Sequence, residues 1–336
     1  MCSLFLIINV SLMYTSKEII AFVREQVEKM NIKATPAGLY DPIRYVLSMG
    51  GKRLRPVLML MAYNLYREDL ERIVPLALGL ETYHNYTLLH DDLMDHADMR
   101  RGHLTVHKKW NENTAILSGD SMLVLAYSMM QQAPAEHLAA VLDLFTRTAL
   151  EIGEGQQYDI DFEERNDVTE DEYIEMIRLK TSVLLACALK IGALTGGAEA
   201  KDSDLLYQFG EKVGLAFQLQ DDYLDVYGDP EKFGKKIGGD ILCNKKTYML
   251  IKAFELADEE QRRILKSWID CKSYVEEEKI SSVRAIYDAV GVPGCCNEKI
   301  NAYFEEALQL LEKVALPEEK KEGLKQFVLT LLDRDV

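Results

Sequence analysis

The sequence is poor in the features that mark several common classes of protein. Lysine and arginine together number 39 against 55 aspartates and glutamates, so the formal net charge at pH 7 is −16. Such an acidic chain is a poor partner for nucleic acid or for an anionic membrane surface. It has only six cysteines, none in a CxxC pair with a matching His or Cys, which predicts reduced thiols in a cytoplasmic protein. No apolar run is long enough to form a transmembrane segment.

The signals of a β-sheet are also missing. We find no alternation of strands with helices, no clean period-two strand pattern and no composition shift that would mark a linker. Instead, apolar residues recur every three or four positions in long stretches, which predicts helices. These stretches are residues 76–93, 121–130, 138–152, 173–194 and 205–226. We predict an all-α fold with one domain over residues 13–336, in which helices from about residue 255 onward pack outside the active core.

The N-terminal residues are set apart from this pattern. Residues 4–8 are apolar, but no positive charge precedes them and the run is short. Thr15 and Glu18 then stand at the spacing of a capping box, which opens a helix. We expect residues 1–12 to be a disordered or mis-assigned start, with folding beginning near Thr15.

Two clusters share one aspartate pattern, Asp91-Asp92-Leu93-Met94-Asp95 and Asp221-Asp222-Tyr223-Leu224-Asp225. Both lie in stretches that predict helix, where residues i and i+4 share a face about 6 Å apart along the axis. Like charges at this spacing weaken a helix, so local stability does not account for them. One such cluster is weak evidence for a site, because acidic runs usually form solvated faces. Two copies, each continuous with an apolar helical stripe, indicate a shared function.

The chemistry of these clusters suits Mg²⁺. Carboxylate oxygens are hard ligands, and Mg²⁺ is usually held by one or two carboxylates together with substrate phosphates. Phe209, Val213 and Phe217 precede Asp221 at i+4 spacing, so the stripe is apolar at one end and anionic at the other. Facing helices of this kind would place carboxylates at the mouth of an apolar cavity. The pattern predicts a ligand whose head is a diphosphate or similar polyanion and whose tail is a hydrocarbon.

Basic residues are placed near both acidic clusters. Residues 50–56 read GGKRLRP, a glycine turn with cations and a proline suited to the first turn of a helix. Arg100 and Arg101 follow the first cluster, Lys180 and Thr181 lie between the two clusters, and a lysine-bearing loop follows the second. Lone dibasic pairs are mostly surface charge, but their joint placement around two acidic motifs indicates an anion site.

With these motifs in order, the chain resembles the trans-isoprenyl diphosphate synthases from about Thr15 to its C-terminus. The matching segments are GGKRLRP, DDLMD with RRG, GQQYD, KT, FQLQDDYLD and GKKIGGD followed by NKKT. The resemblance implies an isoprenoid-synthase helical bundle around a deep central cavity, usually a homodimer. It implies condensation of an allylic diphosphate with isopentenyl diphosphate, giving farnesyl or geranylgeranyl diphosphate and free diphosphate.

The resemblance also implies a role for individual residues. Three Mg²⁺ ions would be held by Asp91, Asp95 and Asp221, with Asp92, Asp222 and Asp225 assisting. The allylic diphosphate and its reaction would involve Arg100, Lys180, Thr181, Gln218, Lys245 and either Lys235 or Lys236. Isopentenyl diphosphate, which carries no metal in this family, would be bound by Lys52, Arg55, His84 and Arg101. Without its spacing to the acidic motif, His84 would more often be a structural histidine. The loop at residues 234–239 would act as a lid that excludes water.

Product length depends on the residues before the first acidic motif. Tyr86 lies five residues before Asp91, about 7.5 Å along the helix, and Tyr83 lies further in. Large aromatic side chains there would end the cavity and stop elongation, although both could simply pack between helices. The compact DDLMD and the non-aromatic Thr87 favour the twenty-carbon product over the fifteen-carbon one.

Other functions are compatible with parts of the pattern. A longer-chain polyprenyl diphosphate synthase would share every motif. A terpene cyclase usually replaces the second DDxxD and needs no isopentenyl site, and a squalene synthase type enzyme lacks GGKRLRP. A non-catalytic regulatory subunit of a heteromeric synthase typically loses an acidic motif, and both are complete here.

Overall fold

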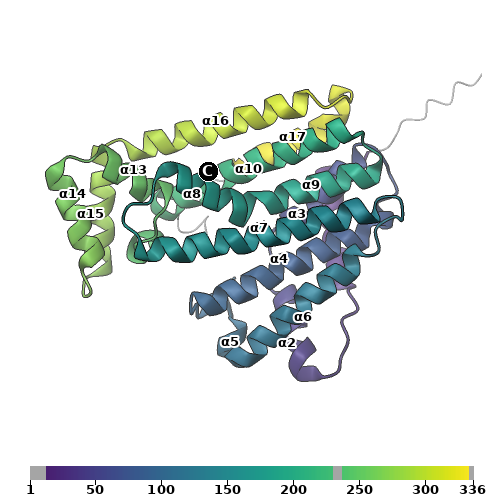
Figure 1. The fold of residues 1–336 in the computed structure, drawn as a ribbon, viewed down its shortest axis with the longest axis horizontal. Helices are drawn as coiled ribbons and strands as arrows, with labels where there is room; N and C mark the ends of the chain where they lie inside the picture. Colours follow the sequence, from purple (N-terminus) through teal and green to yellow (C-terminus); the bar gives the residue numbers. More distant parts are fainter. Residues whose placement is uncertain (1–12, 230–236, 333–336) are drawn as a thin grey trace, which may run out of the picture. The chain divides into compact units, whose positions relative to one another are not determined.

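The computed structural model describes residues 13–229 and 237–332, and these are almost entirely helical (Figure 1). Within them, the only strands are the two-residue β1 (Met99–Arg100) and β2 (His103–Leu104), which pair antiparallel in a hairpin. The predicted all-α class is therefore confirmed. The expectations for residues 1–12, Lys235 and Lys236 fall outside the described residues. Among the described helices, none is both long and apolar enough to cross a membrane.

The chain divides into two compact units. Unit 1 contains residues up to 138 with residues 191–198 and 316–323, and unit 2 contains residues 139–190, 199–315 and 324 onward. The single domain expected over residues 13–336 stays a prediction. In unit 1 the helices are α1 (Ser16–Glu28), α2 (Ala37–Ser48), α3 (Leu54–Asn64), the 3₁₀ turn η1 (Leu70–Ile73), α4 (Val74–Met94), α5 (Val106–Lys109) and α6 (Glu112–Met130).

Unit 2 is built from the later helices. Its helices are α7 (Leu138–Glu164), whose first residue belongs to unit 1, α8 (Glu170–Ile177), the π-helical turn η2 (Arg178–Ser182), α10 (Ala200–Tyr227), α12 (Gly239–Leu242), α13 (Tyr248–Leu256), α14 (Glu259–Asp270), α15 (Glu276–Ala289) and α16 (Val292–Glu312). Two further helices, α9 (Val183–Gly196) and α17 (Glu318–Leu332), are divided between the units.

Local sequence signals set the predicted start of the first helix. Thr15 is the N-cap of α1, where its side chain accepts the backbone N–H of Glu18 and Glu18 accepts the N–H of Thr15. The predicted capping box is therefore confirmed. It stabilises the start of the helix because it satisfies two backbone N–H groups that would otherwise lack an acceptor. Pro56 lies in the first turn of α3, as GGKRLRP predicted.

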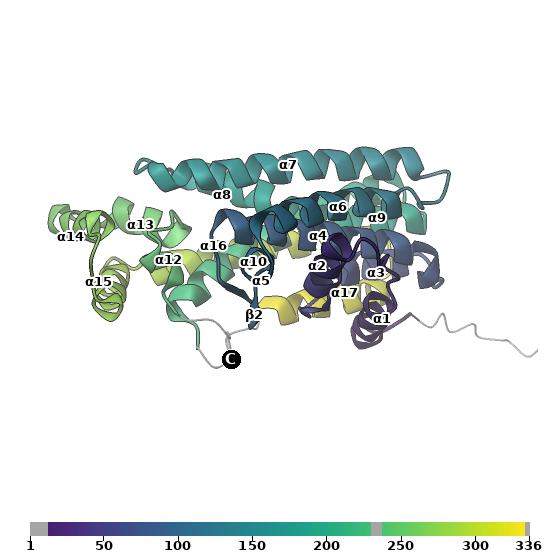
Figure 2. The ribbon, with the colours of Figure 1, turned by 90° about the horizontal axis from the view of Figure 1, so that it is seen from below.

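The core of unit 1 is formed where α4 lies beside α6, with α2 against α6 (Figures 1 and 2). Gly79 allows this approach, since a Cβ atom there would lie 3.0 Å from Met129 Cβ and 3.2 Å from the carbonyl oxygen of Ala126. Ile43 of α2 is fully buried in this core, as is Met122 of α6. The close packing fixes the helix that carries the first acidic motif.

In unit 2, α10 is held along much of its length by α16 (Figures 1 and 2). Leu219 of α10 and Cys296 of α16 are fully buried in the same core. Gly214 brings α10 against η2, because a Cβ atom there would lie 2.5 Å from Ser182 Cα. The buried residues of α16 recur at helical spacing, as expected of a helix that packs against α10. The expectation that helices beyond residue 255 lie outside the active core stays a prediction.

Candidate active site

The first acidic motif lies at the C-terminal end of α4. Asp91 and Asp92 belong to the last turn, and Asp95 is the C-cap residue. From β1, Arg100 donates through Nε to Asp92 Oδ1 at 2.7 Å, and its Nη2 lies 3.7 Å from Asp91 Oδ2. Burial raises the pKa of Asp92 to about 6, although Arg100 acts to lower it. Arg100 therefore lies closer to Asp92 than to Asp91.

The second motif repeats this division on α10. Asp222 is 3% exposed; its Oδ1 accepts a hydrogen bond from Gln218 Nε2 at 3.1 Å, and its Oδ2 accepts one from the buried Tyr173 hydroxyl. Burial, reinforced by the charge of Asp240, raises the pKa of Asp222 to about 8. Asp221, one residue earlier, is only partly buried. In both motifs the second aspartate is thus the one directed into the protein.

Asp225 has a separate task in unit 2. Its Oδ2 accepts the backbone N–H of Asp240 at 2.9 Å, and its own carbonyl accepts the N–H of Gly238 at 2.6 Å. Gly238 has a φ of +82°, which glycine adopts without strain. Asp225 therefore holds residues 238–240, at the C-terminal end of the lysine-bearing loop, against the end of α10.

The charge at both motifs fits a divalent cation. Each motif lies near the C-terminal end of its helix, where the helix dipole is itself negative. The raised pKa values of Asp92 and Asp222 arise because burial outweighs the help of nearby donors and cations. Over residues 13–229 and 237–332, no three His, Cys, Asp or Glu side chains are arranged to hold a metal ion by themselves. This donor set suits Mg²⁺ completed by substrate phosphates.

Two predicted lysines of unit 2 meet at one carboxylate. Lys180 Nζ lies 2.5 Å from Asp159 Oδ2, and Lys245 Nζ lies 3.7 Å from the same oxygen. Burial alone would raise the pKa of Asp159, but Lys245 and Lys180 hold it below its usual value. Asp159 therefore fixes two ammonium groups from separate segments close together.

The turn that carries Lys180 is a π-helix, which is uncommon and frequent at functional sites. Next to Lys180, Thr181 donates from Oγ1 to Gln218 Oε1 at 3.1 Å, and Gln218 in turn donates to Asp222. A hydrogen-bonded chain thus connects the predicted residues Thr181 and Gln218 to the second acidic motif.

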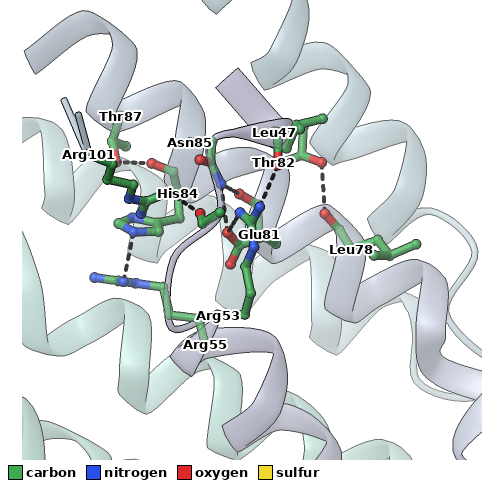
Figure 3. Close-up of polar contacts among 11 residues, drawn as sticks. Leu47, Arg53, Arg55, Leu78, Glu81, Thr82, His84, Asn85, Thr87 and Arg101 are labelled. Carbon is green, nitrogen blue, oxygen red and sulfur yellow. Dashed lines mark hydrogen bonds and ion pairs between the residues drawn. The ribbon is translucent and has the colours of Figure 1, made fainter. Parts of the chain in front are cut away.

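Unit 1 contains a cationic cluster around the glycine turn (Figure 3). Arg55 Nη1 lies 3.0 Å from His84 Nε2, and Arg101 donates to the carbonyl of Gly50. Burial, followed by the charges of Arg55 and Arg101, lowers the pKa of His84 well below 6.5. His84 is therefore a neutral imidazole that accepts a hydrogen bond from Arg55. Lys52 is exposed at the edge of the same segment.

The predicted chain-length residues lie on another side of α4. A five-residue separation turns the helix through about 500°, so Tyr86 points about 140° away from Asp91. Its ring lies 5.5 Å from that of the buried Tyr83 and 4.8 Å from that of His90. A Cβ atom on Gly119 of α6 would fall 2.2 Å from His90 Nε2, so this aromatic group packs toward α6. Thr87 Oγ1 donates to the carbonyl of His84.

Several residues of these networks were given no role by the sequence. They are Asp159, Tyr173, Asp240, Arg53 and Glu81. Asp159 lies in the GQQYD segment, and Glu81 precedes His84 by three residues on one helix, so both had a local signal. Tyr173 had none, because it reaches Asp222 across 49 positions of sequence.

Comparisons with known proteins agree with this chemistry. The family model described as polyprenyl synthetase matches residues 36–290. A geranylgeranyl diphosphate synthase of Methanosarcina mazei is 43% identical over 222 residues, covering 66% of this chain and 68% of that protein. A geranylgeranyl pyrophosphate synthase of Geoglobus acetivorans is 40% identical over 263 residues, covering 74% and 82%. A crystal structure of a geranylgeranyl pyrophosphate synthase superposes with a TM-score of 0.92 at 43% identity, covering 96% of this chain and 100% of the other. The chain therefore belongs to the polyprenyl synthetase family and is a prenyltransferase.

Proposed function

We propose that this prenyltransferase condenses an allylic diphosphate with isopentenyl diphosphate and releases inorganic diphosphate. One observation carries the proposal: the β1–β2 hairpin presents Arg100 to the first acidic motif and Arg101 to the glycine turn. Two consecutive residues thus contact two neighbouring sites. The acidic site is suited to a diphosphate that carries metal ions, and the cationic site is suited to a diphosphate without metal ions. An enzyme that binds two diphosphates at once needs this pairing.

The cationic cluster binds isopentenyl diphosphate in this proposal. Lys52, Arg55 and Arg101 supply positive charge, and guanidinium groups can bind phosphate oxygens through two parallel hydrogen bonds. His84 is neutral, so it contributes a ring N–H and keeps Arg55 oriented.

The acidic motifs and the lysines bind the allylic diphosphate. Asp91, Asp95 and Asp221 would hold Mg²⁺, three ions by the family pattern, which would neutralise charge on the departing diphosphate. Arg100, Lys180 and Lys245 contact the same anion directly. Lys180 and Lys245 are already held together at Asp159, so little side-chain freedom remains to be lost on binding.

The reaction then needs no nucleophilic side chain. The allylic carbon–oxygen bond breaks, and its electron pair leaves with the diphosphate, where the cationic groups stabilise the charge. The π electrons of isopentenyl diphosphate form the new carbon–carbon bond, and the adjacent carbon loses a proton to the released diphosphate. The hydrogen bond from Thr181 Oγ1 to Gln218 Oε1 orients both side chains, so their oxygens can stabilise the allylic cation.

We propose a short-chain product, with geranylgeranyl diphosphate favoured. The Tyr86 ring contacts those of Tyr83 and His90, and His90 packs against α6, so in this proposal the channel ends on the side of α4 that faces α6, about 7.5 Å along the helix axis from Asp91. The names of the relatives in Methanosarcina mazei and Geoglobus acetivorans support the twenty-carbon product.

We also propose a cytoplasmic homodimer. The five cysteines among the described residues are all free thiols, as expected in a reducing compartment. On α6, Ile116, Leu117 and Val124 are 44%, 60% and 68% exposed, an apolar row that a second copy could cover.

Incubation with isopentenyl diphosphate, Mg²⁺ and each allylic primer, followed by product analysis, tests the function. We expect condensation that ends at twenty carbons. Asp91→Ala and Asp221→Ala should each reduce kcat by at least about a thousandfold with an unchanged circular dichroism spectrum. Asp143→Ala, at an exposed pair with Arg147 on α7, is the matched control and should keep full activity. No condensation with any primer would refute the proposal.

A further inference from the structure

Glu81 is a buried carboxylate on α4 with no role in the chemistry described above. It is 1% exposed, and its Oε1 lies 2.5 Å from Nη1 of Arg53, whose side chain is also buried. Asn85, one turn later, donates from Nδ2 to the same oxygen at 2.7 Å and to the carbonyl of Glu81 at 2.8 Å (Figure 3). Asn85 thereby holds the carboxylate in the orientation that receives Arg53.

Arg53 lies in the turn that carries the cationic cluster. Its backbone φ is +51°, a left-handed conformation that is unfavourable for a residue with a side chain. Its Nη2 donates to the carbonyl of Leu47 at the end of α2, so one guanidinium connects α2, the turn and α4. The left-handed backbone of Arg53 is retained because these contacts hold its side chain in the protein interior.

The same turn is held at a second point by Arg101. Gly51 has a φ of +120°, and a Cβ atom there would lie 2.7 Å from Arg101 Cζ. The missing side chain makes room for the guanidinium that donates to the carbonyl of Gly50. Lys52 stands between these two attachments, and Arg55 follows in the first turn of α3. The positions of both residues therefore depend on how firmly the turn is held.

The positive charge of the surrounding arginines accounts for the buried carboxylate of Glu81. The guanidinium groups of Arg53, Arg55, Arg100 and Arg101 all lie close enough to His84 to lower its pKa. Burial, followed by the charge of Arg53, lowers the pKa of Arg101, and Glu81 opposes this effect. Glu81 thus offsets repulsion within the cluster from its buried side, which leaves the exposed side positive toward an incoming anion.

We propose that Glu81 is a positioning residue for isopentenyl diphosphate, acting through Arg53 on the turn at residues 50–53. The inference rests on the proposed function, and it assigns no contact between Glu81 and the substrate. It predicts a selective effect, because Lys52 and Arg55 are the substrate contacts that the turn places. A pair that only stabilised the fold would affect both substrates alike or neither.

The test is the Glu81→Gln variant, which keeps the size of the side chain but removes its charge. We expect the KM for isopentenyl diphosphate to rise about tenfold or more, while the KM for the allylic diphosphate stays within about twofold. Calorimetric binding of isopentenyl diphosphate alone should weaken by a similar factor. An unchanged KM for isopentenyl diphosphate in the folded variant, or an equal rise for both substrates, would overturn the inference.

A matched control lies in unit 2. Glu170 bridges Lys252 and Lys299 at 2.5 and 2.7 Å and is partly buried, so Glu170→Gln should lower the melting temperature and leave both KM values unchanged. If Glu81→Gln fails to fold, Arg53→Lys replaces it: this variant keeps the charge pair but lacks the fork that also reaches Leu47, and the same selective rise is expected. An unchanged KM in Arg53→Lys would then overturn the inference. Absence of turnover in the wild-type protein would instead refute the proposed function.

Discussion

At the scale of single residues, the two acidic motifs divide their labour in the same way. Asp92 and Asp222, the second aspartates, are 5% and 3% exposed and accept hydrogen bonds from protein donors. They fix the position of each motif within its unit. The first aspartates, Asp91 and Asp221, are less buried and remain the proposed metal ligands. In each five-residue motif, the second aspartate thus positions the motif and the first aspartate is the proposed metal ligand.

The neutral state of His84 predicts a loss of stability in acid. Its pKa in the folded protein lies well below 6.5, whereas an unfolded histidine titrates near that value. Below about pH 6.5, His84 therefore binds a proton in the unfolded chain but not in the folded protein. The contribution of His84 to the free energy of unfolding should be constant above this pH and fall by up to about 1.4 kcal/mol per pH unit below it, whereas Asp92 and Asp222, whose pKa values are raised, act in the opposite direction. Urea unfolding at pH 7 and pH 5.5 of the wild type and of a His84→Asn variant isolates the contribution of His84. The same pH slope in a His84→Asn variant would assign the effect to another group.

Tyr86 provides a test of product length. Replacing it with alanine removes the ring that stacks edge-on against His90, and the space that remains should admit a longer tail. We expect products beyond twenty carbons in chromatographic analysis of the Tyr86→Ala variant. Tyr158→Ala, at an exposed tyrosine on α7, should leave the distribution unchanged. If the Tyr86→Ala products match those of the wild type, the end of the channel lies elsewhere.

At the scale of elements, glycine positions decide where helices can approach each other. On α7, a Cβ atom on Gly155 would lie 2.4 Å from the backbone nitrogen of Lys180 in the π-helical turn. Gly153, two residues earlier, faces open space. The approach of α7 to η2 therefore depends on one of these two glycines.

This difference predicts opposite outcomes for two similar variants. Gly155→Ala should displace the backbone at Lys180, destabilise the protein by about 1–3 kcal/mol and lower kcat at least about tenfold. Gly153→Ala should stabilise it by up to about 1 kcal/mol through helix propensity and keep kcat unchanged. Thermal unfolding and steady-state kinetics on both variants measure these effects. Equal behaviour of the two variants would contradict the packing argument.

The helices themselves could be predicted from the sequence because their signals are local. The capping box at Thr15, the apolar stripe through Phe209 and Val213, and the helical setting of both acidic motifs are confirmed. The contacts between helices could not be predicted, because nothing near Asp222 in sequence specifies Tyr173 as its donor. The proposed site residues came from motif spacing, and their roles stay predictions.

At the scale of the whole molecule, each unit carries an acidic motif together with cations of its own. Unit 1 has arginines, with Arg100 paired to Asp92, and unit 2 has lysines, with Lys180 paired to Asp159. Within each unit, an apolar core includes residues of the helix that carries the motif, Leu89 of α4 and Leu219 of α10. A substitution in one core is therefore expected to disturb that unit's motif first.

The proposed homodimer predicts an effect of charge on α6. Glutamate at Leu117 and Val124 together would place two carboxylates in the apolar row and oppose association. We expect size-exclusion chromatography with light scattering to report a dimer for the wild type and a monomer for this double variant. Val275→Glu, at an exposed apolar residue before α15, should remain dimeric. A wild-type monomer would contradict the proposal.

The π-helical turn has a consequence at the level of the gene. A π-helical turn contains about one residue more than an α-helical turn. The turn η2 is therefore equivalent to an α-helical turn into which one residue, encoded by one codon, has been inserted. Deleting one codon there would restore a regular helix and rotate the residues before it by about 100° relative to those after it. Inserting or deleting one codon in this segment can therefore change the direction in which Lys180 points, even when Lys180 and Thr181 are both kept. A one-residue gap at this position in an alignment would then indicate a different placement of the lysine in the site.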